Sequence, residues 1–236
     1  METYIQDEFG NSWISEVNFY RGSKKIGISD NHRMAFYHFG KYGENNSHFV
    51  HIDTHPDFSR FSKNSREAIL ANPGYLDTPE SFIKLQRLGE EKVAVNWGDW
   101  IEGLRGLFPQ LIKSAQICVQ KNTASFEQAW PEAEIISAPA TFPIIPPSSD
   151  LPTLYSLDID YYFTSGGNFC ELRIEEPRAL EHFRKTLHLI KEAPDCLPFI
   201  ALSPTCCGGW ENTLPFTRIV DEIYGTNVTR IIEEHL

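Results

Sequence analysis

The sequence predicts an α/β fold in which a mainly parallel β-sheet is covered by helices on both faces. The first observation is that short apolar runs, typical of buried strands, alternate with longer segments of helical periodicity. Strands that alternate with helices favour a parallel sheet, because each crossover lays a helix on one face. The second is the length of 236 residues, 41% of them hydrophobic, which fits a single domain spanning residues 1–236 with a sizeable core.

Each expected strand is a short apolar run bounded by turn or polar residues. These runs cover residues 25–29, 48–53, 114–120, 133–137, 154–158 and 196–202. The expected helices cover residues 31–41, 65–71, 79–88, 99–107, 177–191 and 214–234. The helix at 177–191 is amphipathic, with Leu180, Phe183, Leu187 and Ile190 on one face. Gly225 marks a weak point in the last helix, and the proline-rich stretch 138–152 is expected to be a loop.

The charge and cysteine content exclude several classes of protein. The net charge of -11, without a local basic cluster, excludes binding to nucleic acid or to an anionic membrane. The acidic N-terminus lacks the apolar core of a signal peptide, and no apolar run is long enough to cross a bilayer. The five cysteines form no CxxC pair, which favours reduced thiols in a cytoplasmic protein.

Three clusters of acidic and histidine residues follow predicted strands. Asp53, His55 and Asp57 alternate, so in extended backbone their side chains point to one side. Asp158 and Asp160 follow an apolar run, and a carboxylate there is costly to bury unless it is paired or binds a metal. His32 follows the first predicted strand.

The carboxyl ends of parallel strands lie at one edge of a sheet, where α/β proteins bind ligands. The clusters therefore predict a metal site with nitrogen and oxygen ligands, enough for two divalent ions that acidify a shared water. The ligand types leave the identity of the first-row ion open. His51 alternates with Asp53 and is either a supporting hydrogen-bond donor or a packed residue. Trp97 and Trp100 are expected in the core, and Cys206 and Cys207 lack the histidine and asparagine partners of a nucleophilic cysteine.

In this order, the clusters resemble the arginase/ureohydrolase superfamily. The matching residues are His32, the run Asp53-Thr54-His55-Pro56-Asp57, and the run Ser156-Leu157-Asp158-Ile159-Asp160. The resemblance implies a three-layer α/β/α sandwich that binds two Mn²⁺ ions. It implies that Asp53 and Asp158 bridge the ions, that His32 and Asp57 complete one and His55 and Asp160 the other, and that Asp57 also carries the proton in catalysis.

Two strings, His51-Ile52-Asp53-Thr54-His55-Pro56-Asp57-Phe58 and Ser203-Pro204-Thr205-Cys206-Cys207-Gly208-Gly209-Trp210-Glu211, resemble a branch of shorter arginase-like proteins. That branch includes peptide arginases, which convert arginine in a ribosomally made precursor peptide to ornithine and release urea. The resemblance implies an arginine-containing precursor peptide as the partner.

The chain departs from the arginase pattern at three places. Phe163 replaces the third aspartate, and the loop that grips a free amino acid is not recognisable in residues 58–67. Thr205 stands near the place of the guanidinium-binding glutamate, so Glu211, the nearest acid, is the candidate for that role. The alternatives are a hydrolase of a small guanidine or amidine, a deacetylase of the same fold, and a non-enzymatic binding module. Deacetylases carry a tandem histidine pair that is absent here. A non-enzymatic binding module would be expected to lack some of the metal ligands, and none of the six is missing. The oligomeric state is left open.

Overall fold

The computed structural model describes the chain except residues 11, 14, 121–129, 138–141, 167–168 and 174. In the described part, eight strands form one sheet in the order β1-β2-β3-β10-β7-β4-β5-β6. The strands are β1 (Glu2–Ile5), β2 (Phe19–Ser23), β3 (Ile26–Ser29), β4 (Ser47–Asp53), β5 (Ile112–Val119), β6 (Glu134–Ser137), β7 (Thr153–Asp158) and β10 (Cys196–Ala201). From β3 to β6 all pairs are parallel, whereas β1 and β2 pair antiparallel at one edge.

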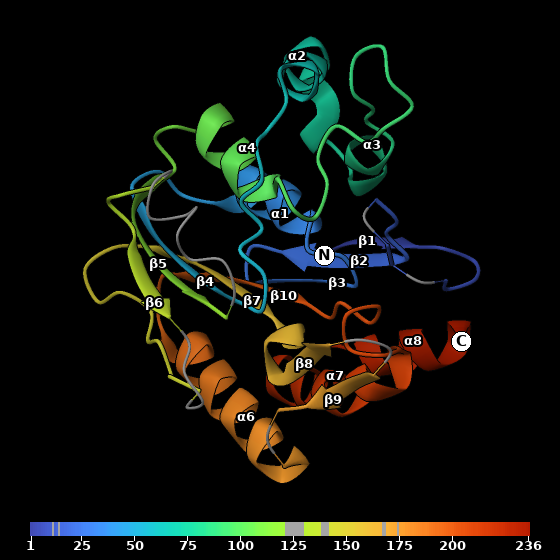
Figure 1. Ribbon diagram of the computed structural model, residues 1–236, viewed down its shortest axis with the longest axis vertical. Helices are drawn as coiled ribbons and strands as arrows, with labels where there is room; N and C mark the ends of the chain where they lie inside the picture. The colour runs from blue at the N-terminus through green and yellow to red at the C-terminus, as the bar shows by residue number, and fades with distance from the viewer. Residues whose placement is uncertain (11, 14, 121–129, 138–141, 167–168, 174) are drawn as a thin grey trace.

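Helices cover both faces of this sheet, so the predicted α/β sandwich is confirmed (Figure 1). One face carries α1 (Met34–Tyr42), α2 (Lys63–Ala71), α3 (Pro79–Ile83) and α4 (Trp100–Leu107), with the 3-10 turn η1 (Pro73–Leu76). The other face carries α6 (Glu176–Glu192), α7 (Trp210–Tyr224) and α8 (Val228–His235). A 3-10 turn, η2 (Ile159–Tyr162), and a hairpin of β8 (Phe163–Gly166) and β9 (Phe169–Leu172) follow β7.

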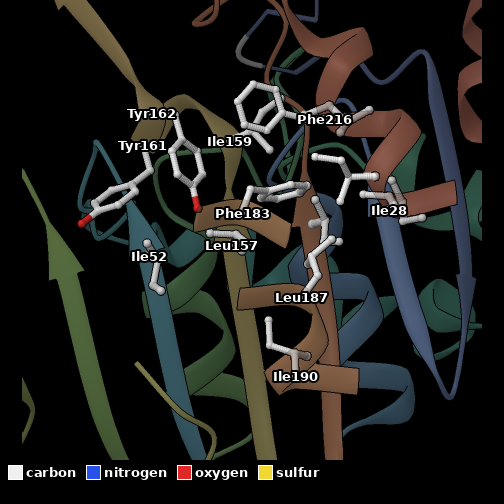
Figure 2. Close-up of a cluster of buried hydrophobic side chains, with 14 of the residues drawn as sticks. Ile28, Ile52, Leu157, Ile159, Tyr161, Tyr162, Phe183, Leu187, Ile190 and Phe216 are labelled. Carbon is white, nitrogen blue, oxygen red and sulfur yellow. The ribbon is translucent and has the colours of Figure 1, made fainter. Parts of the chain in front are cut away.

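The core lies in two layers because alternate strand residues face opposite helices. Figure 2 shows one layer, in which Phe183, Leu187 and Ile190 of α6 pack against Ile52 and Leu157 of the central strands. These α6 residues are buried, as the amphipathic pattern predicts. In the other layer, strand residues whose side chains point to the opposite face of the sheet, such as Phe49 and Leu154, pack against α1 and α4.

Several elements differ from the sequence prediction. The helix expected at 79–88 ends at Ile83, because the chain then turns and Gln86 forms an isolated bridge with Val93. The last helical segment begins at Trp210 and breaks at Gly225, whose φ of 66° is left-handed and ends α7 before α8 begins. Part of the predicted loop 138–152, residues 138–141, lies outside the described residues. No helix in the described ranges combines the length and apolarity needed to span a membrane.

Candidate metal centre

The candidate centre lies at the carboxyl ends of strands β3, β7 and β4. Strands β7 and β4 are neighbours, and β10 lies between β3 and β7. Asp53 ends β4 and Asp158 ends β7, so both carboxylates sit at this edge. The side chains at 49, 51 and 53 alternate with those at 50 and 52, and Phe49 belongs to the layer of α1 and α4. The strand period therefore turns Asp53 toward that layer.

One part of the centre gathers around His32. Its Nδ1 lies 3.0 Å from Asp53 Oδ2, 3.0 Å from Asp57 Oδ2 and 3.2 Å from Asp158 Oδ2. Adjacent ligands of an octahedral ion with bonds of about 2.1 Å lie about 3 Å apart, so these spacings suit one coordination sphere. The Nδ1 atom is buried and makes no hydrogen bond of normal geometry to the described residues. His32 Nε2 is held 2.7 Å from Ser156 Oγ, which orients the ring.

A second part gathers around His55. Its Nδ1 lies 2.9 Å from Asp160 Oδ2 and 3.7 Å from Asp53 Oδ1. Asp53 thus turns one carboxylate oxygen toward each histidine. One ligand atom each of Asp53, Asp158 and Asp160 also lie within 4.8 Å of one another. These buried clusters are compatible with two ions that share Asp53 and Asp158.

Backbone hydrogen bonds hold the two aspartate motifs in register. The His55 N–H donates to Asp53 Oδ1 at 2.7 Å, and the Asp160 N–H donates to Asp158 Oδ1 at 2.9 Å. The Thr54 N–H and hydroxyl donate to the Asp160 carboxylate and carbonyl, joining the β4 motif to the β7 motif. The backbone at Asp57 has a φ of 49°, a left-handed conformation that is uncommon outside glycine. The chain after β4 is therefore bent back to bring Asp57 to His32.

Burial and neighbouring charges shift the pKa values of the four carboxylates. Burial, followed by the charge of Asp160, raises the pKa of Asp53 and of Asp158 to about 7. Burial also raises the pKa of Asp57. Burial alone lowers the pKa of His55, but hydrogen bonds to Asp160 and Asp53 outweigh it and raise this pKa to about 11.

Histidines are the nearest cationic partners of these acids. Among the described residues, no lysine or arginine lies within ion-pair distance of the four carboxylates. Each of the four is at most 3% exposed. Buried acids without a lysine or arginine partner are costly, and divalent cations are the charge that such a donor set suits.

Several supporting residues were not predicted. The Trp100 indole N–H donates to Asp57 Oδ2 at 2.8 Å, so this buried tryptophan belongs to the site as well as to the core. Ser203 Oγ donates to Asp158 Oδ2 at 2.5 Å. Ser203 follows β10, so the rule that placed the other clusters at strand ends also indicates this segment. One ligand atom of Cys206 lies within 4.8 Å of those of His55 and Asp160.

His51 lies behind the carboxylates. Its Nε2 is 3.7 Å from Asp53 Oδ2, and its Nδ1 is 3.4 Å from Ser156 Oγ. Burial and then the charge of His32 hold the pKa of His51 well below its usual value, so the ring is neutral. It remains close enough to serve as a ligand in a rearranged site, and it otherwise packs against Trp100.

A cavity of about 130 Å³ adjoins the centre. Its lining residues are Ser12, Trp13, Asp30, Asn31, His32, Trp97, Ser203, Thr205 and Cys206. Trp97 was expected in the core, but it is partly exposed and lies edge-on to His55 with ring centroids 5.6 Å apart. Trp13, which also lines the cavity, is 60% exposed.

The structure does not bring Glu211 to this cavity. Glu211 stands exposed in the first turn of α7 and lines a different depression, together with Phe163, Glu171 and Glu176. No contact among the described residues joins it to the carboxylate cluster. Thr205, which the arginase pattern places near the guanidinium-binding position, lines the cavity instead.

Comparison of the chain with family models, with curated proteins and with solved structures finds no match. The motifs, the mostly parallel sheet and the geometry of the buried clusters are therefore the features of the chain that bear on its function.

Proposed function

We propose that the protein is a binuclear metal-dependent hydrolase that acts on the guanidinium group of peptidyl arginine. The reaction would release urea and leave ornithine in a precursor peptide. The observation that carries this proposal is the convergence of four buried carboxylates with His32 and His55 at one sheet edge, beside a cavity.

The donor set fits two divalent ions. His32, Asp57, Asp53 and Asp158 would hold one, and His55, Asp160 and the same two bridging aspartates would hold the other. When bound, such a pair of ions supplies an acidified water close to the substrate. Mn²⁺ stays a prediction from the arginase resemblance.

Asp57 is the proposed proton carrier. The Trp100 indole N–H lies 2.8 Å and His32 Nδ1 lies 3.0 Å from its Oδ2, so these two side chains orient the carboxylate. It would accept the proton of the attacking water and deliver it to the leaving amine.

The cavity supports a planar cation as the substrate group. Trp13 and Trp97 supply aromatic surfaces, and a guanidinium is attracted both to such faces and to adjacent carboxylates. The net charge of -11 would also favour approach of a cation.

The same cavity favours a peptidyl over a free amino acid. The described lining contains no lysine or arginine to pair with an α-carboxylate. Its acid, Asp30, already accepts hydrogen bonds from the backbone of Asn18 and Phe19. An arginine within a peptide has no free α-carboxylate or α-amino group, so it needs neither a cationic nor an acidic partner in the cavity.

The test is incubation of the Mn²⁺-loaded protein with free arginine or with arginine-containing peptides. Urea is quantified, and ornithine in the peptide is located by mass spectrometry. Urea from peptides alone is the expected result, and the Asp158→Asn variant should abolish it while Asp150→Asn, an exposed control, retains it.

The other outcomes identify the alternatives. Urea from free arginine alone would point to a small-guanidine hydrolase. Acetate from acetyl-lysine peptides, with no urea from either arginine substrate, would replace the proposal with a deacetylase. Stoichiometric metal without any product would contradict all of these substrates.

A further inference from the structure

The turn between β10 and α7 brings a thiol to the centre. Its backbone folds back on Ser203, whose carbonyl accepts hydrogen bonds from the N–H groups of Cys206 and Cys207 at 2.9 and 3.0 Å. Ser203 itself has a φ of 40°, and Gly208 and Gly209 also have positive φ. The Ser203 hydroxyl donates a hydrogen bond to Asp158, and this bond ties the turn to the carboxylate cluster.

Cys206 shares a group of ligand atoms with His55 and Asp160. One atom of each lies within 4.8 Å of the other two, although the three residues come from three separate strand ends. Zinc-type sites have bonds of about 2.3 Å to sulfur and about 2.0 to 2.1 Å to nitrogen, which puts their ligand atoms roughly 3 to 4 Å apart. The group is therefore close to the spacing that a shared ion requires.

The environment of this thiol differs from that of the two buried cysteines, Cys118 and Cys207. The Cys207 thiol donates to the Leu202 carbonyl, and the Cys118 thiol pairs with the Tyr161 hydroxyl. In the described part of the chain, the Cys206 thiol has no such bond, and it faces the cavity rather than the core. A cysteine that only packs is surrounded by apolar side chains.

A second observation also points to a cation here. His32 Nδ1, 2% exposed as a residue, makes no hydrogen bond to the described residues and faces three carboxylate oxygens. This nitrogen belongs to the adjacent ion position, which shares Asp53 with the position that His55, Asp160 and Cys206 border.

We propose that Cys206 is a ligand of the ion held by His55 and Asp160, which gives that position a sulfur, nitrogen and oxygen donor set. This inference rests on the metal centre of the proposed function and goes beyond it in the choice of ion. A thiolate favours Zn²⁺, Co²⁺ or Fe²⁺ over Mn²⁺ or Mg²⁺, so the two ion positions would differ in preference.

The test is reconstitution of the full chain with Co²⁺, followed by equilibrium dialysis and near-ultraviolet absorption. We expect a sulfur-to-cobalt charge-transfer band in the wild-type protein and its loss in Cys206→Ser. Cys207→Ser, in the same turn, and Cys196→Ser, at the other end of β10, should keep the band. Loss of a residue that only hydrogen-bonds a metal ligand lowers metal affinity about tenfold or more, and loss of a ligand should lower it at least as much. Cys206→Ser should therefore lower Zn²⁺ affinity at least about tenfold and Mn²⁺ affinity less.

A measurement on the wild-type chain covers the case in which Cys206→Ser does not fold. Alkylation mapped by mass spectrometry should show that Zn²⁺ protects Cys206 and leaves the labelling of Cys170 unchanged. Equal labelling of Cys206 with and without Zn²⁺ would overturn the assignment.

The outcomes separate this inference from the proposed function. Two bound Co²⁺ ions without a thiolate band would remove Cys206 from the ligand set and leave the hydrolase proposal standing. A thiolate band without urea from any substrate would support the ligand and overturn the substrate. Absence of any bound cobalt would overturn both.

Discussion

Replacing Asp53 by asparagine should make the metal-free protein more stable while abolishing its stabilisation by metal. Asparagine has the same shape, and its carbonyl oxygen can still accept the His55 N–H that Asp53 Oδ1 accepts. What the change removes is one buried negative charge among three other carboxylates.

The magnitude follows from the pKa of Asp53. Burial and the neighbouring aspartates raise this pKa from 3.8 to about 7. At about 1.36 kcal/mol for each pH unit, ionised Asp53 destabilises the metal-free folded state by up to about 4 kcal/mol. Allowing for relaxation of the pocket, we expect Asp53→Asn to raise the free energy of unfolding by about 1 to 4 kcal/mol at pH 8.

The dependence on pH has a definite sign. A folded-state pKa above the unfolded value means that the folded protein binds this proton more tightly. The stabilisation by the protonated form is complete below pH 3.8 and is lost as the pH rises through about 7. The difference between Asp53→Asn and the wild type should therefore be near zero at pH 4 and largest above pH 7.

The assay is urea denaturation of both proteins, stripped of metal, at several pH values, repeated with saturating Mn²⁺. Metal at one hundred times its Kd should stabilise the wild type by about 2.7 kcal/mol and the variant far less. The exposed Asp150→Asn variant serves as the control and should change neither quantity. Equal or lower stability of metal-free Asp53→Asn at pH 8 would refute the reasoning.

Three further predictions concern the cavity, the support of Asp57 and the metal. Trp97→Ala should raise KM for arginine peptides about 2- to 30-fold through loss of a cation–π contact, as judged by initial rates, and Trp97→Phe should preserve most of the affinity; a fall in kcat at unchanged KM would contradict it. Trp100→Phe should lower the unfolding free energy by about 1 to 3 kcal/mol in urea denaturation, because it removes the hydrogen bond to Asp57; an unchanged denaturation midpoint would show that this bond is dispensable. Dialysis against a chelator should abolish urea release and lower the melting temperature until Mn²⁺ is restored, and activity that survives complete metal removal would contradict the proposed chemistry.

Much of the candidate centre is a local property of the sequence. Asp53 and Asp57 flank His55 at a period of two, and Asp158 and Asp160 follow a run that is apolar enough to be a core strand. The common edge of parallel strands is sufficient to predict that Asp53 and Asp158 meet. The strand period does not reach Asp57 or Asp160, because β4 ends at Asp53 and Asp160 lies in the 3-10 turn η2. The sheet and the long helix α6 were predictable because their patterns depend only on near neighbours. That residues 1–236 form one domain stays a prediction.

Other features required partners that are distant in the chain. The antiparallel strands β1 and β2 and the hairpin β8–β9 carry weak local patterns, and their pairing decides their structure. Trp100 reaches Asp57 only because α4 packs over β4.

The turn after β10 shows most clearly which features depend on the tertiary structure and not on the local sequence. The arginase resemblance suggested Glu211, the acid nearest to Thr205, for binding the guanidinium. In the structure α7 begins at Trp210, and its first turn leaves Glu211 exposed. The same turn brings Ser203 and Cys206 inward. The sequence by itself determined which strand ends carry the acids and histidines, because each apolar strand pattern and the polar residues that follow it are local in the chain. Only the tertiary structure decided which residues surround them, because the direction of a turn depends on the hydrogen bonds and packing that close it.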